Sequence, residues 1–215
     1  IKHCGKSTQA RLLSKFYSCP AFDTDDLIFE MTGKSPREIY NEFGKDSFLE
    51  AETNACIFLQ KKLEGRFSVI ATGGGICNNS NAIEIIKNNG ILIFLDSEEE
   101  IAIQRILKEI EIKQDGTLEN VPAYIAKEHP KNLDDVRKIF HDFYVNRTEL
   151  YNSICDVKIS IGNASKAENK QKLIDAIDIP FTTKFPAKIG EKAMPFMICV
   201  INIGAHATPF TVEIP

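Results

Sequence analysis

The chain has 215 residues, of which 43% are apolar, and a formal net charge of −4. This length and composition are enough to bury a core, so a disordered chain is excluded and one α/β domain, with or without an extension, is expected. The charge balance and the lack of a lysine or arginine cluster argue against a nucleic-acid partner. No apolar run is long enough to cross a membrane, and the six cysteines are scattered, so the sequence predicts a soluble, cytoplasmic protein without a structural metal. It carries no signal for an oligomeric state.

The first motif is Gly5-Lys6-Ser7-Thr8, at the start of an expected helix over residues 7–16. With the four residues before it, the run matches the phosphate loop G-x-x-x-x-G-K-[ST] from its second position onward, so the first glycine would stand one residue before the printed chain. Such a loop binds ATP through its backbone amides, its lysine reaches the β- and γ-phosphates, and its serine holds Mg²⁺. The candidate cofactor-binding residues are Cys4, Gly5, Lys6, Ser7 and Thr8. The alternative is a polar turn in which Ser7 or Thr8 caps the helix.

Two strand ends carry the next candidate groups. A short strand around residues 21–22 ends in Asp23-Thr24-Asp25, and a buried strand over residues 68–71 ends in Thr72-Gly73-Gly74-Gly75. Ligands bind at the carboxyl ends of strands in open α/β sheets. We expect Asp25 to orient an acceptor hydroxyl and take its proton, and the glycines to leave backbone amides open to a substrate or phosphate. The alternatives are helix capping by the two aspartates and a flexible glycine turn.

Helices and buried strands alternate along the following part of the chain. Helices are expected over residues 36–43, 46–63, 81–89, 98–110, 133–151 and 165–177, and strands over residues 91–95 and 156–161. Gly116, Pro122 and Pro130 interrupt residues 113–132, a long connection of the kind that often forms a lid. Strands separated by helices predict a three-layer α/β/α fold with a parallel sheet.

The last part of the chain has a different pattern. It contains two β-prone runs, 196–203 and 210–214, with turn residues between them. Because an isolated hairpin is marginally stable, we expect this one to pack on the domain or on another subunit. The predicted division is a domain over residues 1–179 and a β-prone extension of unassigned role over residues 180–215.

Several motifs occur together in the order of a known family. They are the GKST loop, Asp23-Thr24-Asp25, Thr32-Gly33-x-Ser35-x-x-Glu38-Ile39, Gly44 with Phe48 and Glu52, the glycine run, and Arg147-x-x-Leu150-Tyr151 before Asp156-Val157. In order and spacing this set resembles the shikimate kinase family over roughly residues 1–178. The resemblance implies a phosphate-loop kinase fold and transfer of the γ-phosphate of ATP, with Mg²⁺, to a hydroxyl of shikimate.

The resemblance implies roles at the phosphate end of the site. Lys6 and Ser7 are similar to the phosphate and Mg²⁺ ligands, and Asp23 is similar to a carboxylate near the magnesium water shell. Asp25 is similar to the carboxylate that holds the acceptor hydroxyls. Lys6 and Asp25 are therefore the catalytic candidates.

The resemblance also implies a binding site for the acceptor and the adenine. Gly73, Gly74 and Gly75 are similar to acceptor-binding glycines, and Arg147 is similar to the lid-side arginine that pairs with the shikimate carboxylate. Arg105 is similar in place to an arginine that lies over adenine. A plain surface position is the alternative for Arg147.

Two positions depart from the family pattern. The stretch that reads F-R-x-x-E in the family is Phe48-Leu49-Glu50-Ala51-Glu52 here, so a leucine replaces a second carboxylate-binding arginine. Residues 113–132 lack the family's arginine-proline-leucine signature and contain lysines. A lysine ammonium is a point charge and does not replace the planar guanidinium of an arginine. Two alternatives therefore stay open: a kinase of another small polyhydroxylated acid or sugar acid, and a nucleotide-binding regulatory module without turnover.

Overall fold

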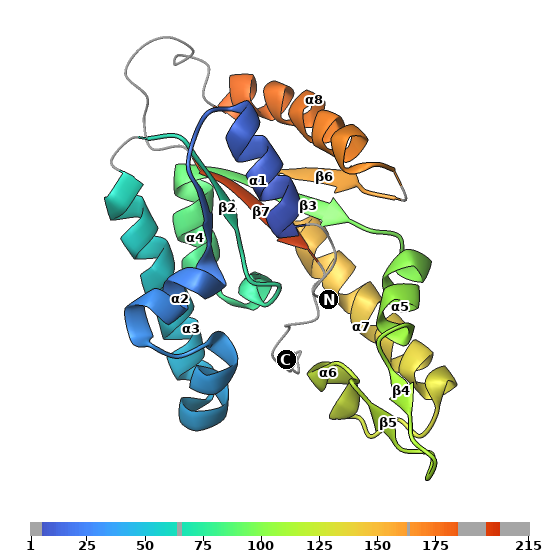
Figure 1. The fold of residues 1–215 in the computed structure, drawn as a ribbon. Helices are drawn as coiled ribbons and strands as arrows, with labels where there is room; N and C mark the ends of the chain where they lie inside the picture. The colour runs from blue at the N-terminus through green and yellow to red at the C-terminus, as the bar shows by residue number, and fades with distance from the viewer. Residues whose placement is uncertain (1–5, 64–65, 163, 185–196, 203–215) are drawn as a thin grey trace.

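The computed structural model describes residues 6–63, 66–162, 164–184 and 197–202. Five of the described strands form a sheet in the order β1-β2-β7-β3-β6. They are β1 (Ala21–Asp23), β2 (Ser68–Ala71), β7 (Met197–Asn202), β3 (Gly90–Asp96) and β6 (Val157–Ser160). Every neighbouring pair is parallel, so the carboxyl ends of all these strands lie along one edge of the sheet (Figure 1).

Helices cover both faces of the sheet (Figure 1). One face carries α1 (Lys6–Phe16) and α8 (Lys166–Lys184), and the other carries α2 (Thr24–Thr32), α3 (Pro36–Leu63), α4 (Ser80–Asn89) and α7 (Leu133–Ile154). None of the described helices is long and apolar enough to span a bilayer.

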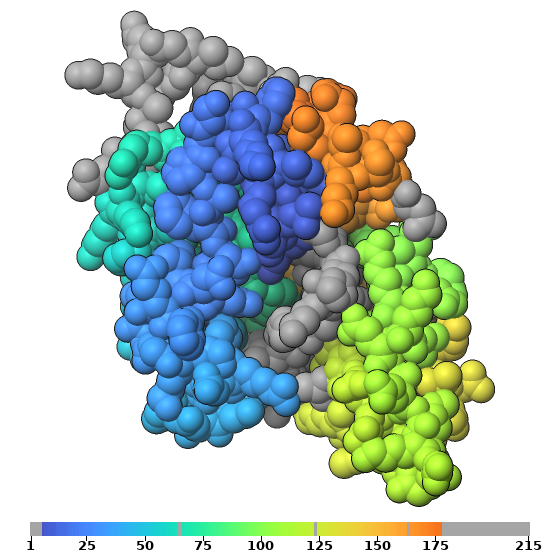
Figure 2. All heavy atoms as spheres, in the orientation of Figure 1, coloured from blue at the N-terminus to red at the C-terminus, as the bar shows by residue number. Residues whose placement is uncertain are grey.

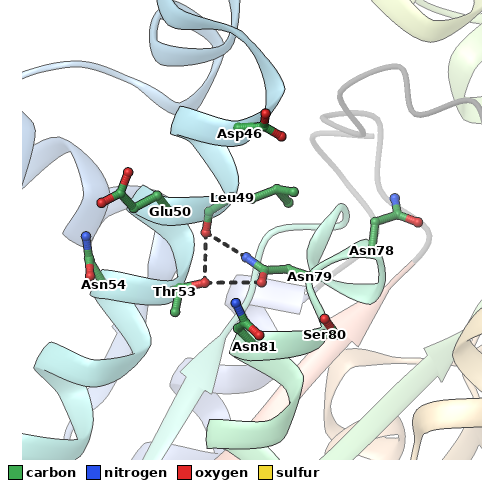
Figure 3. A pocket seen from close by; sticks show the side chains of 9 residues that line it. All are labelled: Asp46, Leu49, Glu50, Thr53, Asn54, Asn78, Asn79, Ser80 and Asn81. Carbon is green, nitrogen blue, oxygen red and sulfur yellow. Dashed lines mark hydrogen bonds between the residues drawn. The ribbon is translucent and has the colours of Figure 1, made fainter.

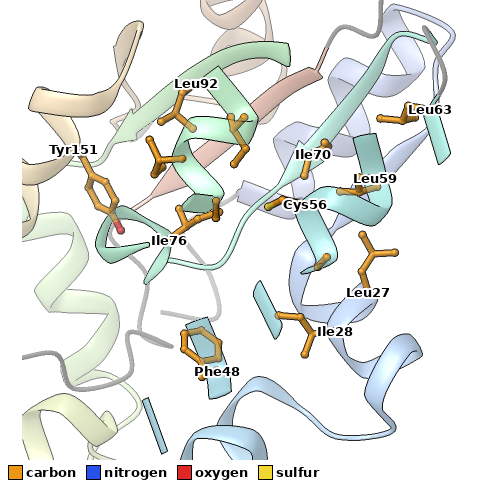
Figure 4. Packing of buried hydrophobic residues seen from close by; sticks show 14 of the residues in the cluster. Leu27, Ile28, Phe48, Cys56, Leu59, Leu63, Ile70, Ile76, Leu92 and Tyr151 are labelled. Carbon is orange, nitrogen blue, oxygen red and sulfur yellow. The ribbon is translucent and has the colours of Figure 1, made fainter. Parts of the chain in front are cut away.

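The two core layers follow from the alternation of side chains along β3. Ile91, Ile93 and Leu95 pack with α1 and α8, whereas Leu92 and Phe94 belong to the cluster formed with α2, α3 and α4 (Figure 4). A strand that is buried on both faces needs apolar residues at every position, which is the pattern of this strand. The predicted α/β fold with a parallel sheet is confirmed, and the sheet lies between two helical layers.

A smaller group of elements lies beside the sheet. It consists of α5 (Glu99–Leu107), α6 (Ala123–Ala126) and the antiparallel pair β4 (Glu111–Ile112) and β5 (Leu118–Glu119). Ile103, Tyr124 and Phe140 share an apolar cluster that fixes this group to α7. In the space-filling view, this group (green) lies on one side of the visible face, and α2 with the start of α3 (blue) lies on the other side (Figure 2). The action of residues 113–132 as a lid stays a prediction.

The break in α3 agrees with the sequence prediction of two helices: at Gly44, where φ is 86°, the backbone leaves the helical conformation. Two other local features differ from the sequence prediction. α8 continues past Pro180 to Lys184. The β4–β5 hairpin lies where the sequence prediction has no strands, and its turn contains Gly116 at a φ of 83°. That left-handed conformation favours glycine.

β7 has a different place in the fold from the one that the sequence predicts. The sequence predicts residues 196–203 as one arm of a hairpin, but β7 pairs in parallel with β2 and with β3. A nearly continuous apolar run is typical of a strand inside a parallel sheet, which explains this position. The other expected arm, residues 210–214, lies outside the described residues. The division into a domain and an extension stays a prediction.

Candidate active site

Lys6 lies at the carboxyl edge of the sheet. It is the first described residue of α1, and its Nζ donates to the backbone oxygen of Thr72, directly after β2. Burial raises the pKa of Asp25, and the positive charge of Lys6 opposes this rise. Asp25 lies against Gly73, the residue after Thr72, so the two side chains share one edge of the sheet. Thr8 is half-buried in the first turn of α1, whereas residues 4–5, which are Cys4 and Gly5, lie outside the described residues.

Ser7 and Asp23 bring two oxygen atoms together beside the start of α1. Ser7 Oγ donates to Asp23 Oδ2 over 3.1 Å, which links α1 to the end of β1. The other oxygen, Oδ1, accepts from the backbone N–H of Asp25 over 3.1 Å and caps α2. Helix capping is therefore confirmed for Asp23 and not for Asp25. The second carboxylate oxygen of Asp23 faces Ser7 at the same time.

Asp25 lies against the glycine turn that follows β2. A Cβ added to Gly73 would lie 3.0 Å from Asp25 Oδ1 and 3.4 Å from Glu52 Oε1, so any side chain at this position would crowd both carboxyls. The Gly73 N–H donates to Thr24 Oγ1 over 2.9 Å, which ties the turn to the start of α2. The turn is therefore held in place by a defined contact and is not simply a flexible glycine segment.

Glu52 on α3 is a buried carboxyl of the same site. It is 1% exposed, and its Oε2 accepts from Asn79 Nδ2 over 3.0 Å, while Oε1 has no hydrogen-bond partner among the described residues. Burial raises the pKa of Glu52 to about 8, so the protonated form dominates at neutral pH. Asn79 Nδ2 also donates to the backbone oxygen of Leu49 over 2.8 Å, which holds this amide between α3 and α4.

Arg147 is a buried cation on α7. It is 4% exposed, so the interpretation as a plain surface arginine is wrong. Its guanidinium donates to the backbone oxygen of Gly74 over 3.5 Å, contacts the Cys77 sulfur, and lies 5.2 Å from the centre of the Phe143 ring. When the Asn78 amide oxygen is turned toward it, that oxygen accepts from both guanidinium nitrogens at 3.1 and 3.2 Å. Within the described part of the chain, Arg147 pairs with no carboxylate.

A pocket with a volume of about 290 Å³ lies between α3 and the segment that leads into α4 (Figure 3). Figure 3 shows the Leu49 side chain extending from α3 toward the side on which Asn78 stands. Since Asn78 also contacts the Arg147 guanidinium, the pocket adjoins the buried cation. The residues that line it are Asp46, Leu49, Glu50, Thr53, Asn54, Asn78, Asn79, Ser80 and Asn81.

Two further basic residues lie in the smaller group of elements beside the sheet: Arg105 on α5 and Lys113 directly after β4. Arg105 is half-buried on α5, and its contact with adenine stays a prediction. Lys113 forms an ion pair with Glu119 across the β4–β5 pair. This pair is exposed at both ends, so it contributes little to stability and leaves the lysine near the tip of its own hairpin.

Two residues of the site have no motif of their own in the sequence. Thr24 stands between the two aspartates, and only the structure shows that its hydroxyl holds the glycine turn. Asn79 accepts the backbone N–H of Ala82 over 3.2 Å and so caps α4. An asparagine just before an apolar helical stretch is an N-cap signal, which could have indicated the second role from the sequence.

The chain is similar to proteins of one family. A family model described as shikimate kinase matches residues 2–178. The shikimate kinase of Clostridium botulinum (strain Alaska E43 / Type E3) is 31% identical over 160 residues, which are 74% of this chain and 92% of that relative. The shikimate kinase of Clostridium botulinum (strain Okra / Type B1) is 33% identical over 172 residues, which are 80% of this chain and 89% of that relative.

Solved structures share the fold. A shikimate kinase from Acinetobacter baumannii, in complex with shikimate, has a TM-score of 0.61 at 22% identity, with 85% of this chain and 89% of that chain covered. A shikimate kinase from Bacteroides thetaiotaomicron has a TM-score of 0.61 at 20% identity, with 80% and 91% covered. At these identities the likeness concerns the fold.

Proposed function

The chain belongs to the shikimate kinase family, and on this premise we propose that the carboxyl edge of its sheet transfers the γ-phosphate of ATP to a hydroxyl of shikimate. The observation that carries this proposal is the meeting of three groups from separate elements. Lys6 at the start of α1 contacts the end of β2, and Asp25 of α2 lies against Gly73 in the turn that follows. A cation for phosphate and a carboxylate for a hydroxyl are thus placed at one edge.

Lys6 holds the nucleotide phosphates in this proposal. Phosphoryl transfer asks the protein mainly to position the reactants and to neutralise charge on the transferred group. The Lys6 ammonium supplies that charge beside Asp25, whose pKa it affects. Lys6 Nζ contacts the backbone oxygen of Thr72, and Asp25 lies against the next residue, Gly73, so both groups can face one phosphate and one hydroxyl.

Ser7 and Asp23 offer oxygen ligands of the kind that Mg²⁺ prefers. Their oxygens lie 3.1 Å apart. Neighbouring ligands of an octahedral magnesium ion at about 2.0–2.1 Å are about 2.9 Å apart, so the pair fits, either directly or through a water molecule. In the described residues no group of three or more acidic, histidine or cysteine side chains is arranged for a metal. When bound, the ion would keep waters and phosphate oxygens as its other ligands and would neutralise phosphate charge.

Asp25 orients the acceptor hydroxyl and receives its proton. A carboxyl with a raised pKa can hold a proton better than an ordinary aspartate, and the Lys6 charge keeps the ionised form accessible. Glu52, on the other side of Gly73, is mostly protonated at neutral pH. A protonated Glu52 cannot accept the proton of the hydroxyl, which leaves this role to Asp25.

Arg147 binds the carboxylate of shikimate. Its guanidinium is buried, and no described carboxylate pairs with it. It can therefore form an ion pair with the carboxylate of a bound ligand. The related protein from Acinetobacter baumannii has been solved in complex with shikimate. Leu49, in place of a second arginine, favours one alternative, a kinase of another small polyhydroxylated acid or sugar acid.

A coupled ADP-release assay with shikimate and with a series of small sugar acids tests the proposal. ADP formation with shikimate supports it, ADP formation only with another acid selects the alternative acceptor, and nucleotide binding without turnover selects the regulatory module. Asp25→Asn should lower kcat at least about 100-fold, because it removes the base, with ADP affinity unchanged. Asp26→Asn is the matched control, since Asp26 is the exposed neighbour on the same helix. Equal activity of the two variants would contradict the role of Asp25.

A further inference from the structure

An aromatic ring on α7 lies between α6 and the buried cation of the site. The rings of Tyr124 and Phe143 are stacked, with their centres 4.1 Å apart and an angle of 26° between their planes. The guanidinium carbon of Arg147 lies over the same Phe143 ring, 5.2 Å from its centre. Phe143 and Arg147 are four residues apart on α7, so they lie on one face of that helix. Phe143 therefore links α6 to Arg147.

The next turn of the same helix face reaches the glycine turn. Tyr151, four residues after Arg147, is fully buried, and its hydroxyl donates to the backbone oxygen of Gly74. Figure 4 shows the Tyr151 side chain extending from its helix toward the segment that carries Ile76. The Arg147 guanidinium donates to the same Gly74 oxygen over 3.5 Å. One face of α7 thus contacts α6 at one end and the acceptor side of the site at the other.

The orientation of the Arg147 guanidinium depends on weak contacts. No carboxylate of the described residues pairs with it, and its bond to Gly74 is long for a hydrogen bond. A guanidinium stacks favourably on an aromatic ring, and this contact restricts the plane of the group. A carboxylate is bound most strongly when two parallel N–H donors of an arginine face it. The plane that the Phe143 ring favours therefore affects the affinity for an acid.

The position of Phe143 depends in turn on α6. The Phe143 side chain is half-buried, whereas Tyr124 is 6% exposed. Tyr124 and Ile125 pack in one apolar cluster with Phe140 of α7, which holds α6 against that helix. If α6 moved away from α7, the Tyr124 ring would leave Phe143. Phe143 would then lose the stacked neighbour that limits its motion.

We propose that Tyr124 and Phe143 position the Arg147 guanidinium, so that the preference of this chain for an acid acceptor depends on an aromatic contact with residues 113–132. The inference rests on the proposed binding of the acceptor carboxylate by Arg147. Tyr124 and Phe143 are positioning residues, since they act through Arg147. An acid that binds better to the stacked arrangement also stabilises this arrangement, so α6 and the acceptor site are coupled in both directions.

Steady-state kinetics with shikimate and with its uncharged methyl ester test the proposal. Phe143→Leu and Tyr124→Leu each remove one ring. They should raise the KM for shikimate about fivefold, with kcat and the KM for the ester within about twofold of the parent. Phe143→Tyr and Tyr124→Phe keep the rings and should keep the KM of the parent. The inhibition constant of the ester replaces its KM if the parent does not phosphorylate the ester.

Phe140→Leu is the matched control. Phe140 is fully buried in the same apolar cluster, and no contact with Tyr124→Leu or Phe143→Leu is needed to compare it, because it removes an aromatic ring from the same helix outside the stack. It should lower Tm by several degrees and leave the ratio of the two KM values unchanged. A loss of acid preference in this variant would show that any weakening of the cluster has the same effect.

A second measurement does not depend on turnover. In a ¹H–¹⁵N spectrum, the side-chain Nε–H signal of Arg147 is identified by its absence in Arg147→Lys. Phe143→Leu should shift this signal, because the ring over the guanidinium is removed. Tyr124→Leu should shift or broaden it as well, because Phe143 loses its stacked neighbour. Phe140→Leu should leave it near its position in the parent.

The outcomes separate this inference from the proposed function. An equal rise of KM for the acid and the ester, no rise for either, or an Arg147 signal that Tyr124→Leu leaves in place would overturn the positioning role. If the parent releases no ADP with shikimate, the proposed function is wrong. The Arg147 signal in the two leucine variants then still decides whether the two rings position the guanidinium.

Discussion

Replacing Glu52 by glutamine should stabilise the protein at neutral pH and flatten the pH dependence of its stability. Glu52 is 1% exposed, and burial raises its pKa to about 8. In the unfolded chain a glutamate titrates near about 4.3. Between these two values the folded state holds a proton that the unfolded state has released. The contribution of this group to stability is therefore fully present below the unfolded pKa and is lost as pH rises toward the folded pKa.

The size of the effect follows from the pKa difference. Each unit is equivalent to about 1.4 kcal/mol, so between about pH 4 and pH 8 this carboxyl removes at most about 5 kcal/mol of unfolding free energy. Glutamine has nearly the shape of the protonated carboxyl and does not ionise. Its amide oxygen can accept the hydrogen bond that Glu52 now receives from Asn79 over 3.0 Å. The variant therefore keeps the contact and removes the titration.

Urea unfolding at pH 5, 6, 7 and 8, followed by far-UV circular dichroism, measures this effect. The free energy of unfolding of Glu52→Gln, minus that of the parent, should rise by about 1 kcal/mol per pH unit. Glu50→Gln is the matched control, because Glu50 is an exposed carboxylate on the same helix. Titration of groups far from Glu52 largely cancels in the difference. A Glu52→Gln variant with the same pH slope as the parent would refute the reasoning, since it would mean that Glu52 is ionised in the folded state.

Two further substitutions test the acceptor side of the site. Leu49→Arg should lower the KM for shikimate about tenfold with little change in kcat, because a guanidinium in the pocket beside Asn78 adds a charge-assisted hydrogen bond to the acid. Steady-state kinetics with shikimate and with its methyl ester check this, and an equal gain for the uncharged ester would contradict it. Gly73→Ala should lower kcat at least about tenfold while Tm moves by only a few degrees, since the new Cβ would lie 3.0 Å from Asp25 Oδ1 and displace a carboxylate that can rotate away. Kinetics combined with thermal unfolding measure both effects, and an unchanged kcat would show that the position of Asp25 is not critical.

The meeting of Asp25 and Gly73 could be predicted because it depends on a general property of parallel sheets. Each residue follows a strand, and the carboxyl ends of parallel strands lie at one edge. The register confirms the closeness: Asp23, at the end of β1, is paired with Ala71, at the end of β2. Any parallel order places both ends at the same edge, but the contact itself also needs β1 and β2 to be neighbours, as they are in this sheet.

The state of Glu52 could not be predicted in the same way. Glutamate in a helix with many polar neighbours is usually exposed. The burial of Glu52 depends on the glycine turn and on Asn79, which lies 27 residues away in sequence. The same holds for Arg147, whose burial depends on contacts with a turn 73 residues away. Charge and spacing identified candidate residues, but their protonation and pairing depend on contacts that a local pattern does not contain.

β7 shows that a β-prone run nearby in the sequence can suggest the wrong pairing partner for a strand. Its apolar run has the same pattern that identified residues 68–71 and 91–95 as buried strands. The sequence nevertheless predicts a hairpin here, because a second β-prone run stands nearby with turn residues between. Each strand buried inside a parallel sheet needs partners on both sides, and the segments 68–71 and 91–95 are separated by a single helical crossover. These two strands are not paired with each other in the sheet, and β7 lies between them. The apolar pattern indicates an interior strand. Its pairing partners, β2 and β3, follow only from the order of the strands in the assembled sheet.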